Sequence, residues 1–242
     1  MSFRKAQSWE HAESQSLGYG HEEIANVYAQ KKSEVHLAVN SPKIRERKAI
    51  LLSFLASYAD SRQLPPIKIL DIGGGNGYFL SWILEQGIRV DEYFVLESEI
   101  IANLYREKYS NNKTLKFISN LPTNETFDLI VLSCTLQYLK SDLDVLKLAQ
   151  KQSKNIILMR HPITRERRKV YAVQTIENHE ETGITVSWPL QIFPEDWVRQ
   201  NLIDGFYIKK EVSMSEEWIE ISGHKFEMSN YLLAKSIDTT NI

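Results

Sequence analysis

The sequence has one cysteine and no long hydrophobic run, and each absence removes a class of protein. Cys134 cannot form an internal disulfide, and no second thiolate is available for a zinc site. The apolar-rich runs are broken by Ser, Asp or Gln before they reach the roughly 20 residues needed to span a bilayer. Residues 1–10 are polar, so we expect no secretory leader. The sequence therefore predicts a cytoplasmic protein without a membrane span.

Excess charge is also missing. The 242 residues include 29 Lys and Arg against 31 Asp and Glu, which gives a net charge of −2. A chain this close to neutral has no overall electrostatic attraction to nucleic acid, so we expect a small-molecule partner instead. With 43% hydrophobic and 25% charged residues, the composition is typical of a globular protein with one large domain. It leaves open whether the protein is a monomer or a homodimer.

Short hydrophobic segments alternate with helical patterns from residue 66 onward. The expected strands are 67–72, 93–96, 115–118, 127–134, 155–159, 206–212 and 226–234, and the expected helices are 78–86, 100–109, 136–150 and 194–202. Strands separated by helices indicate a parallel sheet, whereas the last two strands, joined by a short polar link, are expected to pair as a hairpin. The predicted fold is a doubly wound α/β domain with a mostly parallel seven-stranded sheet that ends in an antiparallel hairpin.

Residues 1–65 lack this alternation. Apolar positions spaced three and four apart predict helices over 21–39 and 44–58, and Pro65-Pro66 ends this part of the chain. We therefore expect two units. Residues 1–65 form an N-terminal helical extension or flap that packs on the domain, and residues 66–242 form the domain itself.

A glycine-rich turn follows the first predicted strand, where open parallel sheets bind ligands. It reads D-x-G-x-G-x-G from Asp71 to Gly77, without the last glycine of a dinucleotide fingerprint and without the Lys-Ser/Thr of a phosphate loop. Glycines allow the backbone to approach a ligand closely. Glu97 ends the second strand, 20 residues after Gly77, where a carboxylate can accept hydrogen bonds from both ribose hydroxyls of a nucleoside. Together these features predict a nucleoside cofactor site; the alternative is a tight turn beside a surface glutamate.

These residues, with the run FDLIVL at 127–132, resemble class I S-adenosylmethionine-dependent methyltransferases over residues 66–235. A narrower resemblance, to methyltransferases encoded in bacterial surface-polysaccharide biosynthesis clusters, covers nearly the whole chain. It rests on Ser8-Trp9-Glu10, Gly18-Tyr19, the run LSCTLQYL at 132–139, and Ser187-Trp188-Pro189. The resemblance implies a Rossmann-like fold and S-adenosylmethionine as cofactor, with S-adenosylhomocysteine as product.

The resemblance also implies roles for individual residues. The glycine turn lines the methionine part of the cofactor, Asp71 helps to hold its ammonium directly or through water, and Glu97 binds the ribose. Ser119 and Asn120, after strand three, lie near the adenine, while Cys134 and Thr135, after strand four, face the methyl-transfer region. The implied cofactor set is Asp71, Gly73, Gly74, Gly75, Gly77, Glu97, Ser119, Asn120, Cys134 and Thr135.

A hydroxyl acceptor often needs a base to remove its proton, and histidine is the natural choice because its pKa lies near 6.5. Of the six histidines, only His161 stands just past a predicted central strand. We therefore predict His161 as general base or substrate ligand. The competing interpretation is a hydrogen-bonded structural histidine.

Several other residues are candidates for acceptor binding. Arg160 belongs to a basic cluster with Arg165, Arg167, Arg168 and Lys169, which either holds a phosphate or carboxylate of the substrate or forms a solvated face. Tyr138, beside Gln137, begins the helix after strand four. Trp188 either stacks on a sugar in a lid segment or packs in the interior, and Tyr19 and His21 either fold over the cofactor as a flap or dock the extension. No acidic cluster follows strand four, so we predict no metal site.

The sequence thus predicts a methyltransferase that acts on a small polar acceptor, a sugar hydroxyl of a surface-glycan precursor such as a nucleotide sugar. The alternative is a non-catalytic S-adenosylmethionine-binding module with a regulatory or scaffolding role. A nicotinamide-dependent enzyme is disfavoured by the incomplete dinucleotide fingerprint. The sequence does not decide between O-, N- and C-methylation.

Overall fold

The computed structural model describes residues 1–18, 41–58, 65–177 and 185–236, so the helix predicted over 21–39 lies outside the described residues. In chain order the elements are β1 (Ser2–Ala6), α1 (Trp9–Ser14), α4 (Pro42–Tyr58), β2 (Ile67–Ile72), α5 (Phe79–Glu85), β3 (Val90–Leu96), α6 (Glu99–Lys108), β4 (Leu115–Ile118), β5 (Leu129–Ser133), the 3₁₀ turn η1 (Leu136–Tyr138), α7 (Asp142–Gln152), β6 (Asn155–Thr164), β7 (Val170–Ile176), β8 (Val186–Pro194), α8 (Trp197–Gln200), β9 (Phe206–Ile221) and β10 (His224–Lys235).

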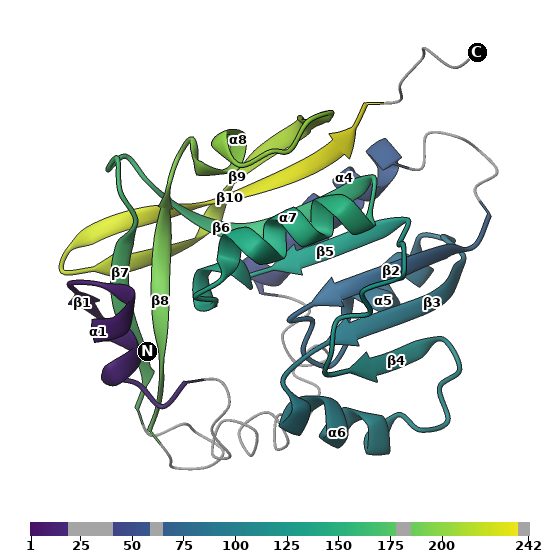
Figure 1. Ribbon diagram of the computed structural model, residues 1–242, viewed down its shortest axis with the longest axis horizontal. Coiled ribbons are helices and arrows are strands. Elements are labelled where there is room, and N and C mark those ends of the chain that lie inside the picture. Colours follow the sequence, from purple (N-terminus) through teal and green to yellow (C-terminus); the bar gives the residue numbers. More distant parts are fainter. Residues whose placement is uncertain (19–40, 59–64, 178–184, 237–242) are drawn as a thin grey trace.

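The predicted parallel sheet is confirmed. Its strands run in the order β4-β3-β2-β5-β6, with every neighbouring pair parallel (Figure 1). β10 then pairs antiparallel with β6, and β9 pairs antiparallel with β10, which confirms the terminal hairpin. Strand order reverses between β2 and β5, and in such sheets ligands bind beyond the carboxyl ends of the strands at this switch point.

The hairpin is longer than expected, because the polar link predicted over 213–225 is mostly strand. Only Ser222 and Gly223 form the turn, with φ of 52° and 79°, as a two-residue turn with two positive φ angles requires. Alternate residues of β9 face inward here, and Glu217 and Ile219 are among them. Alternation of inward-facing and outward-facing residues, as in this segment, is typical of a half-buried strand.

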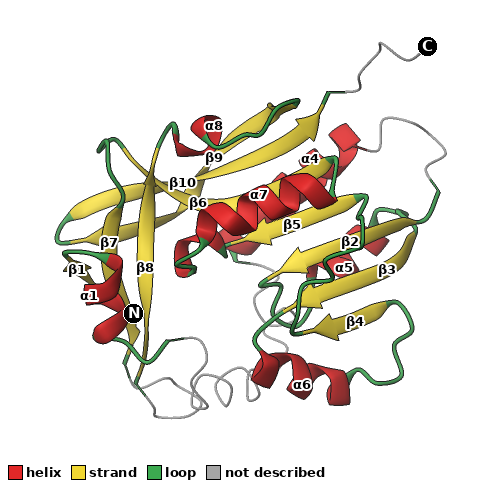
Figure 2. Ribbon diagram, in the orientation of Figure 1, coloured by secondary structure: helices red, strands yellow, loops and turns green. Residues whose placement is uncertain are grey.

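Helices cover both faces of the sheet, as a doubly wound fold requires (Figure 2). On one face, α4, α5 and α6 bury Phe54, Phe79 and Ile101 against alternate strand residues such as Ile69 and Val131. On the other face, α7 and α8 contribute a second core, with Leu146, Trp197, Leu70, Leu132 and Leu158 among its members. The two cores fix β2 and β5 between them, so the loops at their carboxyl ends start from rigid positions.

Strands β1, β7 and β8 form an additional antiparallel ladder. It includes the segment around Trp188, for which a lid was expected. β7 pairs with β8 along its length, β1 joins the outer edge of β7, and β8 is linked to the end of β6 through two parallel pairs (Figure 1). Trp9 and Ala12 of α1 are buried against this ladder. Residues 1–18 therefore dock as a strand and a helix rather than as helix alone.

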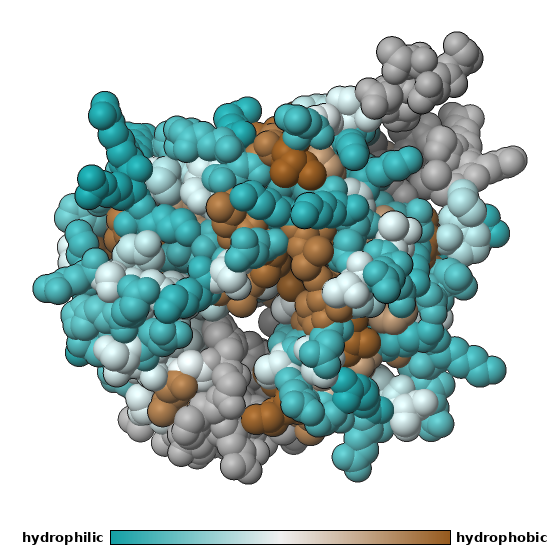
Figure 3. Space-filling model, in the orientation of Figure 1, coloured by the Kyte–Doolittle hydropathy of each residue, from teal (hydrophilic) through white to brown (hydrophobic). Residues whose placement is uncertain are grey.

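The carboxyl ends of β2, β3 and β5 point toward the part of the molecule that carries β7 and β8 (Figure 1). Figure 3 shows that hydrophilic residues cover most of this face and that hydrophobic residues gather near its centre. None of the helices in the described parts of the chain combines the length and hydrophobicity needed to span a bilayer.

Candidate functional site

The glycine turn between β2 and α5 places backbone where side chains do not fit. A Cβ on Gly74 would lie 2.2 Å from Oδ2 of Asp71, so this position requires glycine for steric reasons. At Gly75, where φ is 59°, a Cβ would meet no atom of the described residues within 4 Å. The turn therefore packs tightly against Asp71 on one side and leaves room on the other, which is the shape of a ligand cradle.

Asp71 lies directly beneath the turn at the end of β2 and is 1% exposed. The Tyr93 hydroxyl donates a hydrogen bond to its Oδ2 over 2.7 Å, but Oδ1 has no partner among the described residues. Burial raises the pKa of Asp71 to about 7; the hydrogen bond from Tyr93 opposes this rise, and the nearby charge of Glu97 adds to it. A buried carboxyl oxygen without a partner is a position that a ligand cation can fill.

Glu97 follows β3 and reaches the same turn. Its Oε1 accepts a hydrogen bond from the Gly75 N–H over 2.9 Å, and its Oε2 accepts one from the Ser98 N–H over 3.3 Å. Burial raises the pKa of Glu97, while these two backbone donors lower it. Two carboxyl groups, from Asp71 and Glu97, thus flank the turn that the sequence singled out as a cofactor site.

The remaining predicted cofactor residues also lie at the carboxyl ends of strands. The Thr135 hydroxyl donates to the Ile72 carbonyl over 2.7 Å and so ties the end of β5 to the end of β2. Because a Cβ on Gly73 would lie 2.8 Å from the same hydroxyl oxygen, Thr135 also supports the glycine turn from behind. Ser119 and Asn120 follow β4, and the Ser119 hydroxyl accepts a hydrogen bond from Arg106.

Cys134, Tyr138 and Trp188 lie together: the Cys134 sulfur is 3.9 Å from the Tyr138 hydroxyl, and Gln174 joins Tyr138 to Trp188. The Gln137 amide donates to the Cys134 sulfur and to the Arg160 carbonyl, over 2.9 and 3.1 Å. The Tyr138 hydroxyl and the Trp188 indole N–H both donate to Oε1 of Gln174, over 2.7 and 3.1 Å.

Trp188 is buried among these contacts, which favours the interior alternative over stacking on a sugar. Gln174 was not singled out in the sequence, because a glutamine on an undetected strand carries no signal.

A β-bulge in β6 decides which residues face the site. Ser229 of β10 pairs with His161 and Tyr231 pairs with Leu158, so two residues of β6 stand opposite the single residue Asn230. Arg160, the second of the two, has φ of 56°. The fully buried Asn230 side chain fills the bulge, since its Oδ1 accepts from the Arg160 N–H over 2.9 Å and its Nδ2 donates to the Val212 carbonyl over 2.8 Å.

Because of this bulge, His161 points into the second core. Its ring stacks on Phe193 with centroids 4.2 Å apart, Trp197 and Tyr231 lie nearby, and neither ring nitrogen has a partner among the described residues. Burial, with a smaller effect of the Lys169 charge, lowers the pKa of His161 to about 3. This placement does not fit the predicted general base, which must reach an acceptor. It also corrects the competing interpretation, because the ring is structural but has no hydrogen-bond partner there.

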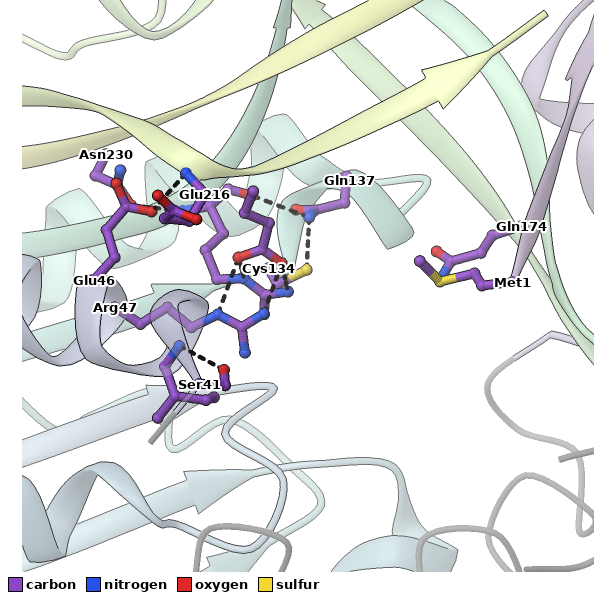
Figure 4. A network of polar contacts seen from close by, with 12 residues as sticks. Met1, Ser41, Glu46, Arg47, Cys134, Gln137, Gln174, Glu216 and Asn230 are labelled. Atoms are coloured by element: carbon purple, nitrogen blue, oxygen red, sulfur yellow. Dashed lines mark hydrogen bonds and ion pairs between the residues drawn. The ribbon is translucent and has the colours of Figure 1, made fainter. Parts of the chain in front are cut away.

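Arg160 instead joins an ion cluster on the opposite side of the strand. Glu217 of β9 accepts hydrogen bonds from Nε and Nη2 of Arg160, over 3.0 and 2.5 Å, and from Nε and Nη2 of Arg47, over 2.9 and 2.7 Å. Although burial raises the pKa of Glu217, the two arginines dominate and lower it to about 2. In Figure 4, the Arg47 side chain extends from α4 toward Cys134 and Gln137.

Arg47 and Glu217 were both missed in the sequence. If the strand had been predicted over the full length of β9, Glu217 would have stood out as a carboxylate on its inward face.

The rest of the predicted basic cluster lies elsewhere. Lys169 donates to both carboxylate oxygens of the buried Asp142, at 2.8 Å each, and Arg165 is an exposed residue near Glu195. Residues 165–168 connect β6 to β7 and are all exposed, which favours the solvated-face alternative for them. Tyr19 and His21, the proposed flap residues, lie outside the described residues.

A protein-family model described as "Methyltransferase domain" matches residues 43–166, about half of the chain. No curated protein matches the sequence significantly.

Solved structures share the fold at low sequence identity. The CcbJ methyltransferase from Streptomyces caelestis is 14% identical, with 90% of this chain and 98% of that chain covered and a TM-score of 0.54. N-methyltransferase NodS from Bradyrhizobium japonicum, in complex with S-adenosyl-L-homocysteine, is 12% identical, with 87% and 96% covered and a TM-score of 0.51. Magnesium protoporphyrin IX methyltransferase from Synechocystis, with bound S-adenosylhomocysteine, is 16% identical, with 89% and 99% covered and a TM-score of 0.53.

Proposed function

Because the chain belongs to the methyltransferase-domain family, we propose that it transfers the methyl group of S-adenosylmethionine to a small polar acceptor, a sugar hydroxyl of a surface-glycan precursor. The observation that carries the cofactor part is the glycine turn flanked by Asp71 and Glu97. Similar structures with bound S-adenosylhomocysteine are consistent with this cofactor.

The residues of the turn fit the cofactor in three respects. The open side of Gly75 accommodates a ligand against the backbone. The unpartnered Oδ1 of Asp71 suits the cofactor's ammonium, directly or through one water. Glu97 ends β3 beside the turn, where its carboxylate would accept hydrogen bonds from the two ribose hydroxyls. Ser119 and Asn120 would adjoin the adenine, and Cys134 the methyl-transfer region.

S-adenosylmethionine supplies a methyl group that is already activated on a sulfonium, so the chain must mainly align an acceptor and exclude water. Gln137 and Thr135 fix the segment after β5, one through the Arg160 carbonyl and the other through the Ile72 carbonyl. Tyr138 is held by Gln174 at the same end of the sheet. Polar groups of this kind, together with Arg160, suit a hydroxyl-rich acceptor such as a nucleotide sugar. His161 takes no part in this proposal, because its ring is enclosed by aromatic side chains.

The cofactor part is tested by calorimetric titration with S-adenosylhomocysteine. Glu97→Ala removes the acceptor of two charge-assisted hydrogen bonds, so we expect about 3 kcal/mol weaker binding, roughly a hundredfold. Glu99→Ala, at the exposed first residue of α6, serves as the matched control and should bind as the unmodified protein does. Equal affinities for Glu97→Ala and the unmodified protein would remove Glu97 from the site.

The catalytic part is tested by supplying methyl-labelled S-adenosylmethionine with a panel of nucleotide sugars. Label transferred to the sugar supports the proposal. Tight binding of the cofactor without transfer to any sugar favours either another acceptor or a non-catalytic module.

A further inference from the structure

We propose that Arg47 and Arg160 together bind an acidic group, a carboxylate or a phosphate ester, on the acceptor. This inference rests on the proposed function, because it names the chemistry of the molecule that is methylated. It differs from the sequence-based interpretation, which assigned this task to Arg160 and the residues at 165–169.

The first argument is the charge of the cluster. Two guanidinium groups share the single carboxylate of Glu217, which leaves one positive charge without a counter-ion in the cluster. Both arginines engage Glu217 only through Nε and Nη2, and Nη1 of each has no partner among the residues that the structure describes. Each guanidinium thus retains a pair of N–H donors, and oxyanions are the groups that arginine donors bind most strongly.

The second argument is accessibility. The Arg47 and Arg160 side chains are 16% and 18% exposed, whereas the Glu217 side chain is 10% exposed. Glu217 is therefore more enclosed than the two arginines, which lie nearer to solvent. A structural ion pair needs only one arginine per carboxylate, so the second arginine exceeds what neutralisation of Glu217 requires.

The third argument is location. Arg160 lies in the bulge at the end of β6, and its carbonyl is joined through Gln137 to Cys134 at the end of β5. Tyr78, which follows the glycine turn, is close enough to Arg47 and Arg160 for both charges to act on its hydroxyl, although burial dominates and raises its pKa to about 12. The cluster therefore borders the glycine turn and Cys134. An acceptor that reaches the methyl group from this side would bring its acidic group to the arginines.

The fourth argument is backbone strain. Arg160 is one of three described non-glycine residues with positive φ, and Cys134 is another. Such conformations persist where the surrounding structure holds them, and they concentrate at functional sites. Here Asn230 holds the bulge through the Arg160 N–H, and the bulge directs the guanidinium to Glu217.

The test uses the full-length protein saturated with S-adenosylhomocysteine and three probes titrated by calorimetry: D-glucuronate, D-glucose 6-phosphate and neutral D-glucose. We expect at least one anionic sugar to bind tenfold or more tightly than glucose, with an affinity that falls as salt is added. The tighter of the two anions identifies the source of the acidic group. Equal affinity for the anionic and neutral sugars, or binding of neither anion, would overturn the proposal.

Arg47→Gln and Arg160→Gln are each expected to reduce the affinity for the anion tenfold or more and to leave that for glucose unchanged. Arg199→Gln, at an exposed ion pair with Glu211, is the matched control and should change neither affinity. Circular dichroism and the affinity for S-adenosylhomocysteine report whether each variant is folded. If a variant fails to fold, the affinities of the three probes for the unmodified protein decide whether an acidic group is bound. Failure to bind S-adenosylhomocysteine contradicts the proposed function instead.

Discussion

The glycine turn with Glu97, proposed to bind the cofactor, and the cluster of Arg47, Arg160 and Glu217, proposed to bind the acceptor, are assembled in different ways. They are called the cofactor side and the acceptor side below. On the cofactor side, Gly75 and Glu97 are 22 residues apart and are placed by two adjacent parallel strands. On the acceptor side, Arg47 and Glu217 are 170 residues apart and meet only because α4 packs near β9. The first arrangement is contained in one βαβ unit, whereas the second depends on most of the fold. We therefore expect a change elsewhere in the fold to disturb the acceptor side more than the cofactor side.

The two sides also differ in charge. Two carboxyl groups, from Asp71 and Glu97, flank the glycine turn, while the acceptor side has a surplus guanidinium. A cofactor with an ammonium and ribose hydroxyls suits the first, and an acidic acceptor suits the second. The division opposes binding of either ligand in the other's place.

The largest effect is expected when the acceptor side loses its carboxylate. Glu217→Ala leaves two close guanidinium groups without their shared partner, and breaking a buried ion pair from one side costs about 3 kcal/mol or more. We expect that loss in the free energy of unfolding, measured by urea denaturation. Because the glycine turn is built locally, the affinity for S-adenosylhomocysteine should change less than twofold at temperatures where the variant is folded.

Glu220→Ala, at an exposed position of the same strand, is the control for this variant. The comparison between the two sides fails if Glu217→Ala is as stable as Glu220→Ala, or if it loses cofactor affinity as strongly as Glu97→Ala does.

A smaller effect is expected from titration of Asp71 on the cofactor side. Its carboxyl group, with a pKa of about 7, is mostly protonated at pH 6 and mostly ionised at pH 8. Binding of an ammonium group favours the ionised form, so the affinity for S-adenosylhomocysteine should rise about tenfold between these pH values, with release of a proton. In Asp71→Asn this dependence should vanish. An equally steep rise in that variant would assign the titration to another group.

The smallest effect is expected for His161→Phe. The histidine ring is buried without hydrogen bonds, and an apolar ring of similar shape should change the free energy of unfolding by less than about 1 kcal/mol at pH 7.5. The folded-state pKa of about 3 lies below the ordinary 6.5, so the unfolded chain binds more protons between these values and stability falls as the pH falls. Between pH 7.5 and pH 5 the unmodified protein should therefore lose about 2 kcal/mol of stability relative to the variant.

His224→Phe, at an exposed position, should not change this pH profile. A large loss of methyl transfer in His161→Phe, without a loss of stability, would restore the role of base that the sequence suggested.

The mostly parallel sheet with its terminal hairpin, and the glycine turn with Glu97 beside it, could be predicted from the sequence because both follow from local patterns. The glycine spacing around Gly75 and the interval to Glu97 need no knowledge of distant contacts. The acceptor side could not be obtained in this way. The pairing of β1 with β7 and the meeting of Arg47 with Glu217 link segments about 170 residues apart, and no single-residue signal marks them. The segment around Trp188, expected to form a lid, is strand β8. It was missed because its residues from Trp188 to Phe193 are all buried, so no alternation of apolar and polar residues marks it.

The orientation of His161 was missed for a different reason. Strand alternation assigns Met159 and His161 to one face and Arg160 to the other. The two-against-one pairing opposite Asn230 reverses that assignment beyond Met159. No sequence pattern predicts this bulge, because Arg160 has a positive φ angle that arginine rarely adopts.

This reversal has a consequence for comparing the chain with other members of its family. Before Arg160, the odd-numbered residues of β6 face one core, and after it they face the other. The side of the strand on which odd-numbered residues lie therefore changes at the bulge. Where a relative lacks such a bulge, an alignment without a gap at this point would equate His161 with residues on the opposite side of the strand. Inserting or deleting one residue there would exchange the positions of Arg160 and His161 between the ion cluster with Glu217 and the aromatic interior.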